Sequence, residues 1–165
     1  MKKAFTLAET LIVLVIIGVI ASLTIPTLMK NVSYNNDKVL FKSAYKIVET
    51  AVSDLISDVA IYPAGQLDIT LCNNFANKMN TLGNINCTSS DYGNKMPNFV
   101  TSNGMAWYGL DLADFNPVDY TIFGVDIDGI NKGTNTLHSD IMAIRLYKTG
   151  KVTVTDPIEI GYLTN

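Results

Sequence analysis

The apolar residues of the chain are concentrated near its N-terminus. No charged side chain occurs from Thr10 to Met29, and Glu9 is the only one between Phe5 and Met29. A helix rises about 1.5 Å per residue, so this run is long enough to cross a hydrocarbon core about 30 Å thick. The pattern predicts a membrane-spanning helix followed, from Lys30 onward, by one domain with a polar surface.

A helical pattern continues beyond the uncharged run. Apolar residues recur every three or four positions from Leu40 to Val59, which indicates one apolar stripe on a helix that Pro63 and Gly65 end. We therefore expect one helix from about Phe5 to about Val59, on the order of 80 Å long. Residues 31–37 include poor helix formers, so a loop there with two separate helices is the alternative.

The remaining residues predict an α+β fold. Residues 71–82 have helical spacing, and a strand-like run covers Tyr120 to Val125. Asn103-Gly104 and Lys148-Thr149-Gly150 each lie between two strand-like runs, which is the signature of a β-hairpin. We expect an antiparallel sheet of four or five strands packed against the second half of the long helix.

Composition narrows the possible functions. The 165 residues suffice for one domain, and the net charge of −3 argues against a nucleic-acid-binding surface. His138 is the only histidine, and the chain has no nucleophile elbow, Gly-rich phosphate loop or metal-ligand spacing. We interpret Asp111, Asp114 and Asp119 as solvated loop residues. No catalytic residue is expected, and the protein is interpreted as a non-enzyme.

Two cysteines, Cys72 and Cys87, follow the membrane segment in the part of the chain expected outside the membrane. An oxidising compartment permits a disulfide between them, which would add about 3 kcal/mol of stability in the chain-entropy model. Two free buried thiols are the alternative. Two cysteines and one histidine are too few for an ordinary zinc site.

Glu9 needs an explanation, because a carboxylate within a bilayer costs about 2–3 kcal/mol or more. It could lie at headgroup level, or it could have a partner of opposite charge.

The N-terminal segment differs from a secretory signal peptide. A signal peptide would have a shorter apolar stretch and a polar chain after it, whereas this run continues through Ile25. The residues Lys2-Lys3-Ala4-Phe5-Thr6-Leu7-Ala8-Glu9 and the following apolar run resemble the prepilin segment of type IV pilins and type II secretion pseudopilins.

The resemblance implies a processing site and an assembly site. A prepilin peptidase would cut between Ala4 and Phe5 and methylate the new amine on Phe5, although the family normally has Gly where this chain has Ala4. Glu9 would then pair with the N-terminal amine of a neighbouring subunit in the filament. Gly18 and Pro26 lie where pilin helices carry a helix-weakening Gly and a kinking Pro.

The resemblance also implies an organisation for the whole chain. Residues 1–4 are a leader, residues 5–30 form the membrane and filament-core helix, and residues 31–165 form an extracytoplasmic pilin-like head. The subunit would be a single-pass protein of the inner membrane that later joins a periplasmic or cell-surface filament. Its partners would be copies of itself, other pilin-like subunits, the peptidase and the inner-membrane assembly platform, with no direct nucleic-acid contact. The alternatives are a pilin-like tip or adhesion subunit and a DNA-uptake subunit. A membrane-anchored extracytoplasmic enzyme is the least favoured alternative.

An acidic loop is a candidate calcium site. Oxygen ligands are dense from Asp126 onward, and the candidate ligands are Asp126, Asp128, Asn131 and Asp140. Major pseudopilins carry calcium in a loop of the head sheet, and this segment is similar in character. The alternative is a Gly- and Asn-rich connection whose side chains bond their own backbone, with no cofactor.

Overall fold

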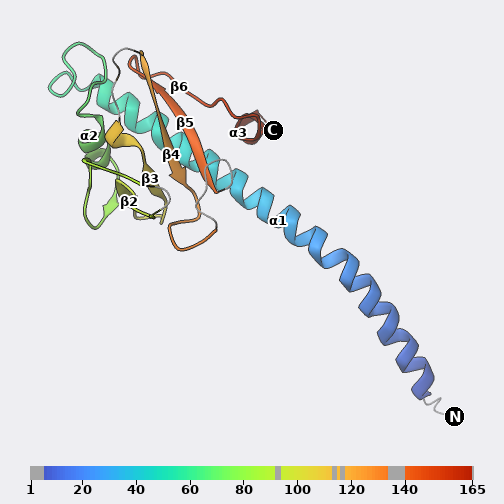
Figure 1. Ribbon diagram of the computed structural model, residues 1–165. Helices are drawn as coiled ribbons and strands as arrows, with labels where there is room; N and C mark the ends of the chain where they lie inside the picture. The colour runs from blue at the N-terminus through green and yellow to red at the C-terminus, as the bar shows by residue number, and fades with distance from the viewer. Residues whose placement is uncertain (1–5, 92–93, 113–114, 116–117, 134–139, 165) are drawn as a thin grey trace. The chain divides into compact units, whose positions relative to one another are not determined.

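The computed structural model (Figure 1) describes every residue except 1–5, 92–93, 113–114, 116–117, 134–139 and 165. The chain forms two units, residues 1–36 and residues 37–165, and each is described by itself. The first unit is helical, and the second combines helices with a sheet, so the fold class is α+β as the sequence predicts.

The first helix, α1, runs from Leu7 to Ser57. Residues 31–37 are helical, so the two-helix alternative is wrong. Their low propensity costs only a few tenths of a kcal/mol each, whereas a break would require a second helix to nucleate. The helix ends two residues before Val59, where the Asp58 side chain accepts a hydrogen bond from the Ala60 N–H at 3.1 Å.

The sheet has six antiparallel strands in sequence order, one or two more than expected. The strands are β1 (Thr81–Leu82), β2 (Phe99–Thr101), β3 (Ala106–Tyr108), β4 (Tyr120–Asp126), β5 (Ile141–Tyr147) and β6 (Val152–Thr153). Both predicted hairpins are confirmed. Gly104 and Gly150 have φ angles of 88° and 84° in the two turns, a conformation that glycine adopts without strain.

The additional strand comes from a segment that was expected to be helical. Helix α2 covers only Leu71–Lys78, and Leu82 pairs with Val100 as part of β1. The prediction for residues 79–82 was therefore wrong. Helical spacing over so short a run cannot exclude a strand, and here the pairing with β2 decides the conformation.

One hydrophobic core lies between the inner face of the sheet and two helices, residues 37–57 of α1 and α2 (Figure 1). Trp107 is fully buried at its centre, and its ring contacts those of Phe75, Phe99 and Phe123 at centroid distances of 5.9–6.1 Å. The head therefore completes a core from its own residues.

A short 3₁₀ helix (η1, Leu110–Leu112) and a C-terminal helix (α3, Pro157–Thr164) complete the described elements. The sequence analysis did not predict α3. Its buried Glu159 accepts a hydrogen bond from the Ala143 N–H of β5 at 2.6 Å, and the Tyr162 ring lies 6.1 Å from that of Phe41. These contacts attach α3 to both the sheet and α1.

Candidate functional site

The N-terminal part of α1 exposes its apolar side chains on all sides. The large apolar residues from Leu7 to Met29 are between 48% and 79% exposed. By length and composition α1 is a candidate membrane span, the one such helix among the residues that the structure describes. A helix that is apolar all round is typical of a membrane span or of a helix buried in a larger core.

The hydroxyl groups within this segment are satisfied inside the helix. Thr10, Ser22, Thr24 and Thr27 each donate to a backbone carbonyl three or four residues earlier, at 2.8–3.4 Å. Such bonds lower the cost of placing a hydroxyl in an apolar environment. These four polar side chains therefore do not oppose burial in lipid or in a bundle of helices.

Gly18 and Pro26 both lie inside α1. A side chain added at Gly18 would meet no other atom of the chain within 4 Å, so packing within the chain does not require glycine there. Pro26 lacks the N–H that would bond to the carbonyl of Ser22. Both residues therefore weaken the helix locally.

Glu9 forms a capping box with Thr6 at the start of α1. Its Oε2 accepts hydrogen bonds from the N–H and the hydroxyl of Thr6, both at 2.9 Å, and Thr6 Oγ1 accepts one from the Glu9 N–H at 3.3 Å. This arrangement satisfies N–H groups that an isolated helix start leaves unpaired. The sequence analysis missed it, although Thr6-Leu7-Ala8-Glu9 matches the capping-box pattern. The proposed processing residues Ala4 and Phe5 lie outside the described residues.

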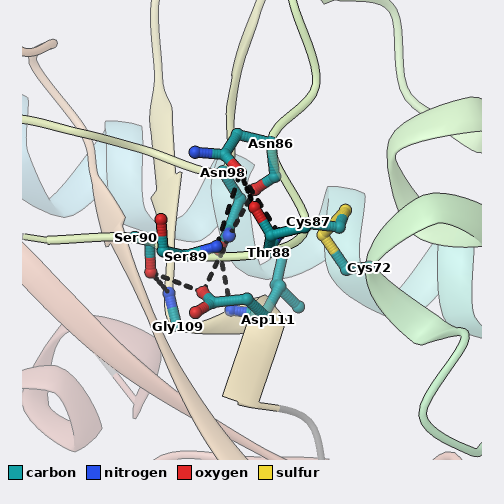
Figure 2. Close-up of a disulfide and its surroundings, with 10 residues drawn as sticks. Cys72, Asn86, Cys87, Thr88, Ser89, Ser90, Asn98, Gly109 and Asp111 are labelled. Carbon is teal, nitrogen blue, oxygen red and sulfur yellow. Dashed lines mark hydrogen bonds between the residues drawn. A yellow bond between two sulfur atoms is a disulfide. The ribbon is translucent and has the colours of Figure 1, made fainter.

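The disulfide between Cys72 and Cys87 is confirmed, with a Cα–Cα distance of 5.7 Å. It joins the first turn of α2 to the loop that precedes β2 (Figure 2). The free-thiol alternative is therefore wrong. Closing this loop restricts the unfolded chain and so stabilises the head.

A partly buried polar network holds the same loop from its other side (Figure 2). Asp111 Oδ1 accepts hydrogen bonds from Ser90 Oγ at 2.6 Å and from Asn98 Nδ2 at 2.8 Å. Asn98 is fully buried, and its Oδ1 accepts from the Leu110 N–H at 2.8 Å. The interpretation of Asp111 as a solvated residue was therefore wrong, because the fold half-buries its carboxylate and brings Ser90 and Asn98 to it.

The two other aspartates of that group differ from Asp111. Asp119 is exposed, as expected, whereas Asp114 lies outside the described residues. Among the residues that the structure describes, the hydrogen bonds around Asp111 involve no histidine or cysteine side chain. The hydrogen bonds of this network satisfy its polar groups, and the network therefore supports the structure of the loop.

The acidic loop brings part of its candidate ligand set together. Asp126 is fully buried, and its Oδ1 accepts a hydrogen bond from the Gly129 N–H at 2.8 Å. The pKa of Asp126 is raised from 3.8 to about 6. Burial is the largest cause, the neighbouring Asp128 and Asp140 also raise this pKa, and the bond from Gly129 lowers it. Asn131 is exposed.

Two carboxylate oxygens in this loop lack a donor. Asp126 Oδ2 and Asp128 Oδ1 are buried without a hydrogen-bond partner among the described residues. The two carboxyl groups can bond to each other when one carries a proton, or they can share a cation. Within the described part of the chain, no group of three acidic, histidine or cysteine side chains is arranged to hold a metal ion. The bond from the Gly129 N–H to Asp126 Oδ1 is of the kind expected in a self-bonded turn, and calcium binding stays a prediction.

Comparison of the chain with known protein families, with characterised proteins and with solved structures finds no match.

Proposed function

We propose that the chain is a structural subunit of a type IV pilus or a type II secretion pseudopilus. The observation that carries this proposal is the contrast within α1. Residues 7–29 expose nearly every apolar side chain, whereas residues 41–55 of the same helix belong to the core of the head. Such a segment requires an apolar environment outside the chain, first lipid and then the helices of neighbouring subunits.

The disulfide supports an extracytoplasmic head. Structural disulfides persist in oxidising compartments and are rare in the bacterial cytoplasm. The Cys72–Cys87 bond therefore favours a topology in which α1 crosses the inner membrane once and the head lies outside it. The filament formed from such subunits would be periplasmic or on the cell surface.

Glu9 supplies the assembly contact in this proposal. In the membrane, the capping box gives the carboxylate two donors from its own chain. In the filament core, the amine of Phe5 from a neighbour neutralises its charge after cleavage behind Ala4. A buried charge persists when an opposite charge meets it, and loss of one partner costs about 3–5 kcal/mol.

Processing gives the first test. Mass spectrometry of the mature protein should show loss of residues 1–4 and a methyl group on Phe5. Retention of Met1, or cleavage after Ala21 as by a general signal peptidase, contradicts the proposal.

Substitutions at Glu9 and Thr6 separate assembly from capping. Glu9→Ala removes both the charge and the cap, whereas Glu9→Gln removes the charge and leaves a residue that capping boxes accept. Thr6→Ala removes the hydroxyl of the box and leaves the charge. We expect Glu9→Ala and Glu9→Gln to lower the yield of sheared filaments at least tenfold, and Thr6→Ala to retain most of it.

The measurement compares sheared filament with membrane-retained subunit, and an oxidised Cys72–Cys87 pair confirms a folded head in each variant. Thr10→Ala is the matched control for Thr6→Ala, because the Thr10 hydroxyl donates only to the Leu7 carbonyl. Normal filament yield from Glu9→Gln together with poor yield from Thr6→Ala would assign Glu9 to capping alone and remove the pairing from the proposal.

A further inference from the structure

An aromatic and basic patch covers part of the outer face of the sheet. The strand register places Ile122, Arg145 and Thr153 side by side across β4, β5 and β6. The next row along the same face contains Tyr120 and Tyr147, with Lys151 beyond them in the turn before β6. We call these six residues the outer patch.

Contacts within the outer patch hold its side chains in place. The Arg145 guanidinium lies 4.5 Å from the centre of the Tyr120 ring, and Lys151 Nζ lies 5.8 Å from that of Tyr147. The two tyrosine rings are 5.8 Å apart. Cation–π contacts of this kind order the long basic side chains before any partner arrives, which lowers the entropy cost of binding.

The charge of the outer patch is opposite to that of the head around it. Residues 37–165 contain 14 acidic and nine basic side chains, and Arg145 is the only arginine of the chain. Neither ion pair found among the described residues includes Arg145 or Lys151. The patch therefore presents two cations and an exposed isoleucine on an otherwise acidic head.

We propose that the outer patch binds an acidic surface on the head of a second copy of this chain. This inference rests on the proposed function, because a filament needs a contact in which two different surfaces of the same subunit meet. Tyrosine and arginine carry much of the binding energy in protein interfaces, and arginine bonds carboxylates through two parallel N–H groups. The net negative head repels a free polyanion, which disfavours a nucleic acid as the occupant.

Charge reversal in the full-length chain tests the proposal in cells. We expect Arg145→Glu and Lys151→Glu to lower the yield of sheared filaments at least fivefold, with normal membrane retention and an oxidised Cys72–Cys87 pair. Lys132→Glu makes the same change of charge on an exposed loop and should leave the yield unchanged. Arg145→Lys keeps the charge, loses the paired N–H groups and should give an intermediate yield.

A photocrosslinker in place of Ile122 tests the contact without changing the charge. We expect filaments to give a crosslinked dimer whose second peptide is an acidic segment of another head. Crosslinking to a nucleic acid or a different protein, or no crosslink in filaments that form normally, overturns the inference. Equal filament yield from Arg145→Glu and Lys132→Glu also overturns the inference. If normal filaments form in these cases, the proposed function still stands and only the contact of the outer patch is overturned. If the wild-type chain forms no filaments at all, the proposed function itself fails.

Discussion

The two ends of α1 differ in how far their apolar side chains are buried within the chain. Leu14 is 67% exposed, whereas Leu55 is fully buried against the sheet and α2. Both residues lie on one helix, so helix formation does not explain the difference. The C-terminal part has one apolar stripe that belongs to the core of the head, whereas the N-terminal part is apolar all round.

The contrast shows that secondary structure and burial are separate problems in this chain. The head obtains its stability from contacts among its own residues. In our proposal, the N-terminal part of α1 obtains its apolar environment from lipid and then from other subunits. Substitutions in the two regions should therefore affect different measurements.

The largest effect is expected from removing a buried leucine. Leu55→Ala should lower the free energy of unfolding of the head by about 2–5 kcal/mol, because it leaves a cavity in the core. Leu14→Ala makes the same change on the same helix and should leave head stability unchanged. The fluorescence of Trp107, the only tryptophan, reports unfolding of the head in the full-length protein in mild detergent. An equal loss in both variants would show that the two regions are not separate.

The disulfide should have the next largest effect. Replacing both Cys72 and Cys87 by Ser opens a loop with a sequence separation of 15, and about 3 kcal/mol of head stability should be lost. Membrane retention of the subunit should not change, because the N-terminal part of α1 does not depend on the head. The same Trp107 signal measures the loss, and reduction of the wild-type protein should reproduce it. Unchanged stability would mean that the Asn98–Asp111 network alone holds the loop.

The acidic loop should make head stability depend on pH. Because the pKa of Asp126 is raised from 3.8 to about 6, the folded head keeps a proton that the unfolded chain releases between about pH 4 and pH 6. Stability should fall as the pH rises through this range and should stay low above it. Asp126→Asn should reduce this dependence and raise stability at pH 7 by about 1–2 kcal/mol. Asp119→Asn, at an exposed position, is the control.

A chelator distinguishes a proton from a cation in this loop. If Asp126 and Asp128 share a proton, chelation should leave the melting temperature of the head unchanged. A lower melting temperature after chelation, restored by calcium and absent in Asp128→Ala, would instead establish a calcium site there.

Features that depend on residues close in sequence could be predicted from the sequence. The uncharged run from Thr10 to Met29 predicts a possible membrane span because length and hydrophobicity are local properties. The Asn103-Gly104 turn predicts the β2–β3 hairpin because few residues adopt the backbone angles that such a turn requires. The capping box of Thr6 and Glu9 was equally local and could have been predicted.

The tertiary structure alone decided the features that join distant segments. Leu82 is in a strand because it pairs with Val100 of β2. Asp111 accepts two side-chain hydrogen bonds because the fold brings Ser90 and Asn98 to its carboxylate. The pKa of Asp126 is raised because the fold buries its carboxyl group beside Asp128 and Asp140. No local pattern contains these contacts, because their partners are set by the path of the whole chain. Local residue patterns are therefore enough to predict the apolar helix and the turns, whereas the fold sets which polar groups are buried and which partners they bond.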